Sequence, residues 1–307
     1  MKILLTGGSG MVGQNILEKS VDFPELTFLS PTSSELNLKD YRQIIAYLKA
    51  ENPDMIIHCA GKVGGIQANL REPVNFLVDN LDMGRNLVMA AKEVGVARLL
   101  NLGSSCMYPR GHKEPLVEEL ILKGELEPTN EGYALAKVMT ARLCEYISCE
   151  DSSLQYKTAI PCNLYGRWDK FAPEHSHLIS AIINKMYEAV KNGVSEVEIW
   201  GDGLAYREFM YAEDLADFIF HCISNFADMP QNLNVGLGTD YTVNEYYQVV
   251  AEVMGFKGSF IHNLSKPVGM RRKLVDVSRL REFGWQHKHS LKEGIGKAIA
   301  FYKEGRK

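Results

Sequence analysis

The sequence predicts an α/β protein with a doubly wound parallel sheet and a smaller C-terminal α/β lobe. Three observations predict it: short continuous apolar runs, segments of helical periodicity between them, and a glycine-rich turn directly after the first run. Continuous apolar runs are typical of parallel strands that helices cover on both faces. The expected strands are Met1–Thr6, Leu26–Leu29, Met55–Cys59 and Arg98–Leu102, and the expected helices are Met11–Lys19, Tyr41–Glu51 and Val74–Val94.

The second half of the chain has a less regular rhythm. We expect shorter strands at Ser195–Trp200 and Gly258–His262, and helices at Leu178–Lys191, Ala212–Ser224, Val243–Met254 and Leu291–Lys303. This pattern predicts a first domain at residues 1–162 and a smaller lobe at residues 163–307. Some segments of that lobe are expected to return to the first domain.

Composition narrows the classes of function. The 307 residues carry a net charge of −4, so no basic field favours nucleic acid or an anionic membrane surface. No apolar stretch is long enough for a transmembrane helix, and the N-terminus does not resemble a signal peptide. The six cysteines form neither a CxxC pair nor a disulfide framework. We therefore expect a cytoplasmic protein with reduced thiols and without a metal site.

The glycine-rich turn predicts a dinucleotide site. Gly7, Gly10 and Gly13 form a GxxGxxG pattern in TGGSGMVG, and Met11 and Val12 lie between the last two. Glycine at these positions permits a tight turn, close approach of the backbone to a pyrophosphate, and close packing of helix on strand. The helix that follows directs its N-terminal amides at the phosphates. A purely structural turn is the less favoured alternative, because this turn links a strand to a helix.

The end of the second strand predicts which dinucleotide binds. An acidic residue there would bind the ribose hydroxyls of NAD, and a nearby Arg would accept the extra phosphate of NADP. The segment LSPTSSE has no Arg, and its first acid is Glu35. Its hydroxyl groups can hydrogen-bond a phosphate instead; they belong to Ser30, Thr32, Ser33 and Ser34. These features favour NADP(H) as the cofactor. The first domain is therefore predicted to be a Rossmann-type, NADP(H)-binding domain.

A catalytic set is predicted at the fourth strand and a later helix. Tyr133 and Lys137 form a YxxxK pair, and residues four apart share one face of a helix. A neighbouring cation is expected to lower the pKa of the tyrosine towards the working range. Ser104 follows the apolar run Arg98–Leu102, at the strand end where open α/β sheets bind ligands. The three side chains suit carbonyl–alcohol chemistry. A core tyrosine with a solvated lysine is the alternative for the YxxxK pair alone.

These motifs resemble the extended short-chain dehydrogenase/reductase superfamily, and within it the GDP-L-fucose synthase family. The resemblance spans nearly the whole chain. It is carried by GGSGMVG, VGGIQAN, GSSCMYP, LEPTNEGYALAK, NLYGR and SHL, and then by WGDG, REFMYAEDLAD, NVGLG and RRKLVDVSRLREFGW. The resemblance implies epimerisation next to the ketone of a GDP-linked 4-keto-deoxy sugar, followed by NADPH-dependent reduction at C4. It also implies a homodimer through the helices that contain Val74–Val94 and Asn130–Ile147.

The resemblance assigns roles by motif. Ser104, Tyr133 and Lys137 take the reductive roles, and Cys106 and His177 take the epimerising roles. Cofactor contacts are expected from Gly7, Gly10, Met11, Val12, Gly13, Ser30, Tyr133, Lys137, Asn163 and His177. Substrate contacts are expected from Ser104, Ser105, Cys106, Asn163, Lys185, Trp200, Arg207 and Arg272.

Several of these roles have simpler alternatives. Cys106 is either a proton-transfer thiol or a buried thiol at a strand end, and His177 either an acid or a helix cap. The guanidinium of Arg207 suits a diphosphate. Arg272 and Lys273 either do similar work or are solvated surface charges. Trp200 either lines a guanine pocket or belongs to the core.

The sequence leaves more than one sugar substrate open. GDP-L-fucose is the favoured product, and the alternatives are GDP-L-colitose, made by epimerisation at C5 alone, and the product of a GDP-4-keto-heptose reductase. Two positions depart from the family pattern near the ligands: Ser9 stands where a basic residue is common, and Lys170 lies beside Asp169. An alternative from another class is a non-catalytic, NADP-sensing regulator. Such a protein has no use for Ser104, Tyr133 and Lys137 together.

Overall fold

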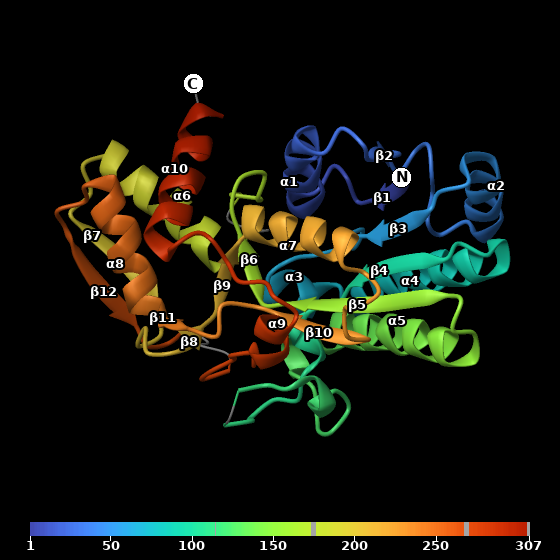
Figure 1. Cartoon of the computed structure of the whole chain (residues 1–307). Helices are drawn as coiled ribbons and strands as arrows, with labels where there is room; N and C mark the ends of the chain where they lie inside the picture. Colours follow the sequence, from blue (N-terminus) through green and yellow to red (C-terminus); the bar gives the residue numbers. More distant parts are fainter. Residues whose placement is uncertain (114, 173–175, 267–269, 306–307) are drawn as a thin grey trace.

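The computed structural model describes residues 1–113, 115–172, 176–266 and 270–305. Figure 1 shows a larger lobe around a central sheet and a smaller lobe, drawn mostly in yellow, orange and red, beside it. The helices and strands that the sequence predicted are all present, and their ends differ from the predictions by at most one residue.

The central sheet has six parallel strands in the order β10-β5-β4-β3-β1-β2. Their bounds are Lys2–Thr6 (β1), Thr27–Leu29 (β2), Met55–His58 (β3), Arg98–Leu102 (β4), Gln155–Pro161 (β5) and Asn232–Val235 (β10). The strand order reverses between β1 and β3, so the carboxyl ends of these strands flank a crevice. The doubly wound, Rossmann-type sheet predicted from the sequence is confirmed.

Side chains alternate between the two faces of the sheet. Ile3 and Leu5 pack in one buried cluster with α1 (Met11–Lys19) and α7 (Ala212–Ser224). Leu4 packs in another with residues from α2 (Tyr41–Glu51), α4 (Pro73–Val94) and α5 (Glu131–Glu150). Each fully buried aliphatic side chain contributes about 1.5–3 kcal/mol relative to its exposed state. Both faces of the sheet are therefore covered, which explains why its strands read as continuous apolar runs.

The smaller lobe has its own buried cluster. Its helices are α6 (Leu178–Lys191), α8 (Val243–Met254) and α10 (Leu291–Glu304), and its small sheets pair β7 (Glu196–Trp200) with β12 (Ser259–Asn263), β6 (Asn163–Tyr165) with β9 (Phe209–Tyr211), and β8 (Tyr206–Arg207) with β11 (Tyr241–Thr242). Capping boxes set the starts of α8 and α10, through Thr242 with Glu245 and Ser290 with Glu293.

Several segments were not anticipated from the sequence. Strand β5 and the short helices α3 (Ile66–Arg71) and α9 (Ser278–Glu282) carried no clear pattern of their own. Strand β10 and helix α7 follow residue 162 in the chain, yet they pack in the larger lobe, as Figure 1 shows. Within the described ranges, no helix is both long and apolar enough to cross a membrane.

Candidate active site

The glycine-rich turn lies between β1 and α1, beside the end of β3. Gly7 adopts a left-handed φ of 78°, and its carbonyl accepts a hydrogen bond from the Gly10 amide at 3.0 Å. A Cβ on Gly13 would lie 2.3 Å from the Gly7 oxygen, so helix and turn pack without space for a side chain. A Cβ on Gly10 would meet only that oxygen, at 3.4 Å, and no side chain caps the N-terminus of α1. Uncapped first-turn amides, including those of Met11 and Val12, beside this open turn fit a dinucleotide pyrophosphate.

The segment after β2 surrounds the outer side of this turn. The Ser30 hydroxyl occupies the space that a Cβ on Gly8 would take, so the two loops are in direct contact. Thr32 bonds through its hydroxyl to Ser34 at 2.9 Å and to the Glu35 carboxylate at 2.8 Å. Bonds from the Thr32 amide and hydroxyl lower the pKa of Glu35. Of the hydroxyl groups expected to face a phosphate, Ser30 is therefore the one placed against the glycine turn.

The reductive set comes together at the end of β4. Ser104 caps a single 3₁₀ turn, Ser105–Met107, and its hydroxyl accepts a hydrogen bond from the Cys106 amide at 3.2 Å. The Ser104 hydroxyl lies close enough to the Tyr133 phenol to lower the pKa of that phenol, against the larger effect of burial. The Lys137 ammonium lies 5.8 Å from the centre of the Tyr133 ring and donates to the Leu102 carbonyl at 2.8 Å. The structure thus brings Ser104, Tyr133 and Lys137 into one cluster, and Ser105 is buried beneath it.

Burial decides the protonation states in this cluster. The expected lowering of the Tyr133 pKa is wrong: removal from water raises the pKa, and the nearby Cys106 adds to the effect. Burial also lowers the pKa of Lys137, to about 8. Both shifts follow from the cost of holding a charge in a medium of low dielectric constant. A phenol that stays protonated at neutral pH is suited to donate a proton to an oxygen that becomes an alcohol.

Cys106 lies next to the reductive set and is partly exposed. Its sulfur accepts a hydrogen bond from the Asn130 side-chain amide at 3.1 Å and from the Lys273 ammonium at 3.7 Å. Asn130 immediately precedes α5, one turn before Tyr133. The sequence analysis gave Asn130 no role, although its place three residues before Tyr133 puts it on the same side of the helix start.

His177 and Asn163 lie at the junction of the lobes. His177 is the N-cap residue of α6, and the carbonyl of its neighbour Ser176 would lie 3.4 Å from a Cβ on Gly65. This places the start of α6 against Gly65, which lies in the VGGIQAN segment directly before α3. The Asn163 side-chain amide donates to the Glu208 carbonyl at 2.9 Å. No contact joins His177 to Cys106 directly among the residues that the structure describes.

The expected substrate residues of the smaller lobe form two groups. In one, Lys185 on α6 donates to the Glu198 carbonyl of β7 at 2.8 Å, and Trp200 ends the same strand with 44% of its surface exposed. In the other, Arg207 and Arg272 lie on either side of Tyr206. Arg207 donates to the Tyr206 carbonyl at 2.6 Å, and the Arg272 guanidinium lies 5.5 Å from the Tyr206 ring centre.

Arg207 and Arg272 each interact with other parts of the protein. Burial lowers the pKa of Arg207. Arg272 forms a two-point ion pair with Asp240, at 2.6 and 3.0 Å, so it is more than a solvated surface charge. Lys185, Arg207 and Arg272 are thus each held by a partner within the protein.

Glu208 was missed by the sequence analysis. Its side chain is 1% exposed, and its carboxylate accepts hydrogen bonds from the amides of Leu237, Gly238 and Val275 at 2.7, 2.9 and 3.0 Å. Burial raises its pKa to about 7. A lone acid in REFMY gives no signal of such a role, because the three amides come from distant segments. Glu208 holds together two loops that border the site.

Comparison with known proteins agrees with this geometry. Residues 3–236 match the model of the NAD dependent epimerase/dehydratase family. The chain is 60% identical to the GDP-L-colitose synthase of Yersinia pseudotuberculosis, with 98% of each chain covered. It is 45% identical to the GDP-L-fucose synthase of Azorhizobium caulinodans, over 99% of this chain and 97% of that one.

A solved structure shows the same architecture. The GDP-mannoheptose C4 reductase of Campylobacter jejuni, solved with NADP bound, superposes with a TM-score of 0.87 at 29% identity, covering 98% of both chains. The match extends through both lobes. The chain therefore belongs to the NAD dependent epimerase/dehydratase family, in the branch that contains the GDP-L-colitose and GDP-L-fucose synthases.

Proposed function

We propose that this protein is a bifunctional enzyme that epimerises a GDP-linked 4-keto-deoxy sugar next to its ketone and then reduces C4 with NADPH. Of the sugars considered, the 3,6-dideoxy sugar that leads to GDP-L-colitose is now the first candidate. The observation that carries this choice is the 60% identity to a GDP-L-colitose synthase, against 45% to a GDP-L-fucose synthase. GDP-L-fucose formation is the second candidate, and a GDP-4-keto-heptose is the third substrate to test.

The cofactor proposal rests on the glycine turn and on relatives. Gly7, Gly10 and Gly13 would hold the pyrophosphate of NADP(H), and Ser30 would contact its adenosine end. When bound, NADPH supplies the hydride for C4. The open turn at Gly10 and the uncapped start of α1 support this placement, and a related heptose reductase has NADP bound.

In the reductive step, the residues of the cluster handle the proton. Tyr133 donates its proton to the C4 oxygen as that oxygen becomes an alcohol, and Ser104 hydrogen-bonds the same oxygen. Lys137 keeps a positive charge beside the phenol and compensates the charge that the phenol leaves behind. The closeness of the Ser104 hydroxyl to the Tyr133 phenol supports this arrangement.

In the epimerising step, Cys106 removes the proton from the carbon beside the ketone, and His177 delivers a proton to the opposite face. Ser104 and Tyr133 stabilise the enolate oxygen that forms. The N–H donors of Asn130 and Lys273 approach the Cys106 sulfur and would stabilise negative charge on it. The C4 ketone is needed for both steps, so epimerisation precedes reduction.

Turnover in D₂O tests this function. Each GDP-4-keto sugar (3,6-dideoxy, 6-deoxy and heptose) is supplied with NADPH, and deuterium at C3 and C5 is measured by mass spectrometry. We expect the 3,6-dideoxy sugar to have a kcat/KM at least about tenfold higher than the others, because one hydroxyl misfit costs about 1–3 kcal/mol. One solvent deuterium is expected at C5. Products without solvent deuterium would leave a simple 4-reductase and contradict the epimerase.

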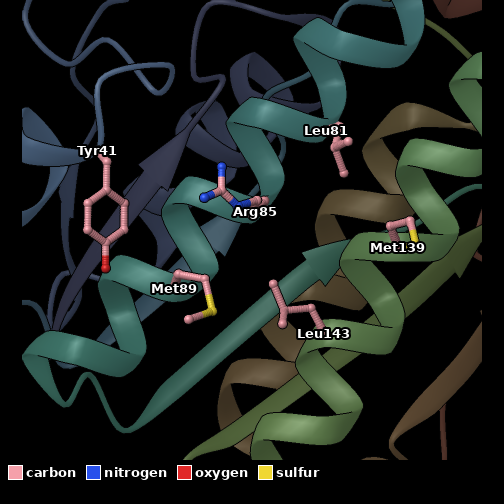
Figure 2. A pocket seen from close by; sticks show the side chains of 6 residues that line it. All are labelled: Tyr41, Leu81, Arg85, Met89, Met139 and Leu143. Atoms are coloured by element: carbon pink, nitrogen blue, oxygen red, sulfur yellow. The ribbon is translucent and has the colours of Figure 1, made fainter.

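We further propose that two copies of the chain associate through α4 and α5. These helices carry exposed apolar side chains in the structure, including Val74, Val78, Met139 and Tyr146. A groove of about 330 Å³ is lined by Tyr41, Leu81, Arg85, Met89, Met139 and Leu143. Figure 2 shows these side chains, which come from α4, α5 and, for Tyr41, the start of α2. Apolar surface of this kind is stabilised when a second copy covers it.

A charge placed in this groove tests the dimer. Met139→Glu is expected to convert the protein from a dimer to a monomer at micromolar concentration, because a charged carboxylate would lose its hydration where the second copy covers this surface. Light scattering after size-exclusion chromatography measures the mass. Val21→Glu, at an apolar position that is 78% exposed and far from α4 and α5 in the fold, is the control and keeps the dimer. A wild-type protein that is monomeric at the same concentration contradicts the proposal.

The proposal also covers the roles of the two lobes and the compartment in which the protein works. Residues 1–162 bind NADP(H), and residues 163–307 mainly bind the nucleotide sugar, with β10 and α7 completing the larger lobe. The six free cysteines suit the reducing cytoplasm.

A further inference from the structure

The Cys106 sulfur receives N–H groups from two distant parts of the chain. The Asn130 amide nitrogen lies 3.1 Å from the sulfur and comes from the start of α5. The Lys273 ammonium lies 3.7 Å from the sulfur and comes from a segment 167 residues further along the chain. Both are donors, and Lys273 also brings a positive charge. Such a pair of donors stabilises negative charge on the atom that it contacts.

The segment that carries Lys273 is anchored directly after that residue. We call residues 270–277 the strap. The Leu116 amide donates to the Leu274 carbonyl at 2.9 Å, and the Asp276 amide donates to the Leu116 carbonyl at 3.0 Å. These bonds fix the strap to the segment that follows the Cys106 turn. The position of the lysine backbone is therefore determined by the fold.

Glu208 provides a second anchor for the strap. One oxygen of its buried carboxylate accepts from Val275, two residues after Lys273, and the other accepts from Leu237 and Gly238. The strap, the loop after β10 and the start of β9 thus share one acceptor. A buried carboxylate with three amide donors is a rigid junction, because breaking any bond leaves a buried polar group unpaired.

The groups around Cys106 leave the positive charge of Lys273 available to interact with the sulfur. Among the described residues, no carboxylate forms an ion pair with Lys273. The Tyr133 phenol faces the thiol from α5 and is kept neutral by burial. The charge of Lys273 is thus not already neutralised by an acid of the described chain, and the Cys106 sulfur accepts its hydrogen bond.

We propose that Lys273 is a positioning residue for epimerisation: held by the strap, its ammonium holds the Cys106 sulfur in place and stabilises the negative charge that this sulfur carries when it acts as the base. This inference rests on the proposed function, in which Cys106 is the base. In the step, the sulfur forms an S–H bond with the proton taken from the sugar, and the electrons of the broken C–H bond enter the enolate. Lys273 keeps its own proton throughout. Binding of the sugar diphosphate is the competing role for this lysine.

Alkylation without substrate tests the contact itself. Iodoacetamide reacts with thiolates, so the rate of Cys106 modification at pH 7, read by peptide mass mapping, reports the thiolate fraction. Lys273→Met is expected to slow this rate about tenfold, and Lys273→Arg is expected to restore it to within about threefold. Lys123→Met, at an exposed lysine away from the site, is the matched control and leaves the rate unchanged. The exposed Cys149 is an internal reference, because its rate changes only if the fold is lost.

Turnover with the GDP-4-keto sugar in D₂O completes the test. Lys273→Met is expected to slow deuterium entry about tenfold with KM changed less than about twofold. An unchanged alkylation rate together with a raised KM overturns the proposal and makes Lys273 a diphosphate ligand. Cys106→Ser distinguishes the two levels of inference: wild-type deuterium entry in that variant contradicts Cys106 as the base. The alkylation rates still decide whether Lys273 acts on the sulfur.

Discussion

Tyr133→Phe is expected to lower NADPH-dependent reduction by about 10²- to 10⁴-fold, the usual contribution of a positioned general acid. The substitution removes only the hydroxyl, so the packing of the ring and the 5.8 Å separation from Lys137 can persist. Solvent deuterium is still expected to enter the 4-keto sugar, because Cys106 and Ser104 are unchanged. Loss of NADPH absorbance measures reduction, and mass spectrometry of the sugar measures exchange.

Tyr146→Phe is the matched control for this variant. Tyr146 lies on the same helix, α5, and is 60% exposed, so its hydroxyl is not expected to matter for reduction. A Tyr133→Phe enzyme that reduced its substrate at the wild-type rate would show that another group supplies the proton. It would also reopen the interpretation of the chain as a non-catalytic, NADP-sensing regulator.

Lys137→Met is expected to abolish reduction and, at the same time, to stabilise the cofactor-free protein at pH 7. The side chain is 7% exposed, and burial lowers its pKa from 10.5 to about 8. That shift corresponds to a cost of up to about 3 kcal/mol for holding the charge at pH 7. Loss of the hydrogen bond to Leu102 offsets about 1 kcal/mol of the gain. A net stabilisation of about 1–2 kcal/mol should appear in denaturant unfolding.

The pH dependence of this effect has a definite sign. The folded-state pKa of Lys137 lies below the unfolded value, so between about pH 8 and 10.5 the unfolded chain binds more protons and wild-type stability rises with pH. Below about pH 8 the cost of the buried charge is fully present. The advantage of Lys137→Met should therefore shrink as the pH is raised towards 10. Lys49→Met, at an exposed lysine of α2, is expected to change stability by less than about 0.5 kcal/mol at either pH. A lower stability of Lys137→Met at pH 7 contradicts the assigned cost.

Much of the architecture was predictable because its determinants are local. The apolar runs of β1, β3 and β4 and the helical periodicity of α4, α6 and α8 lie within single segments, so their bounds agree with the structure to within one residue. The glycine turn is local as well, since Gly7, Gly10 and Gly13 meet each other through backbone contacts over a few residues. The YxxxK spacing placed Tyr133 and Lys137 on one helix face for the same reason.

Other features were decided only when distant segments met. The sequence by itself determined the strand–helix alternation and the dinucleotide turn, and it predicted which side chains are reactive. The tertiary structure decided that β10 completes the sheet, that burial raises rather than lowers the pKa of Tyr133, and that Lys273 lies against Cys106. It also made Glu208 a junction of three amides from two distant loops. Periodicity reports local hydrogen bonding and one buried face, whereas desolvation and pairing depend on neighbours far apart in the chain.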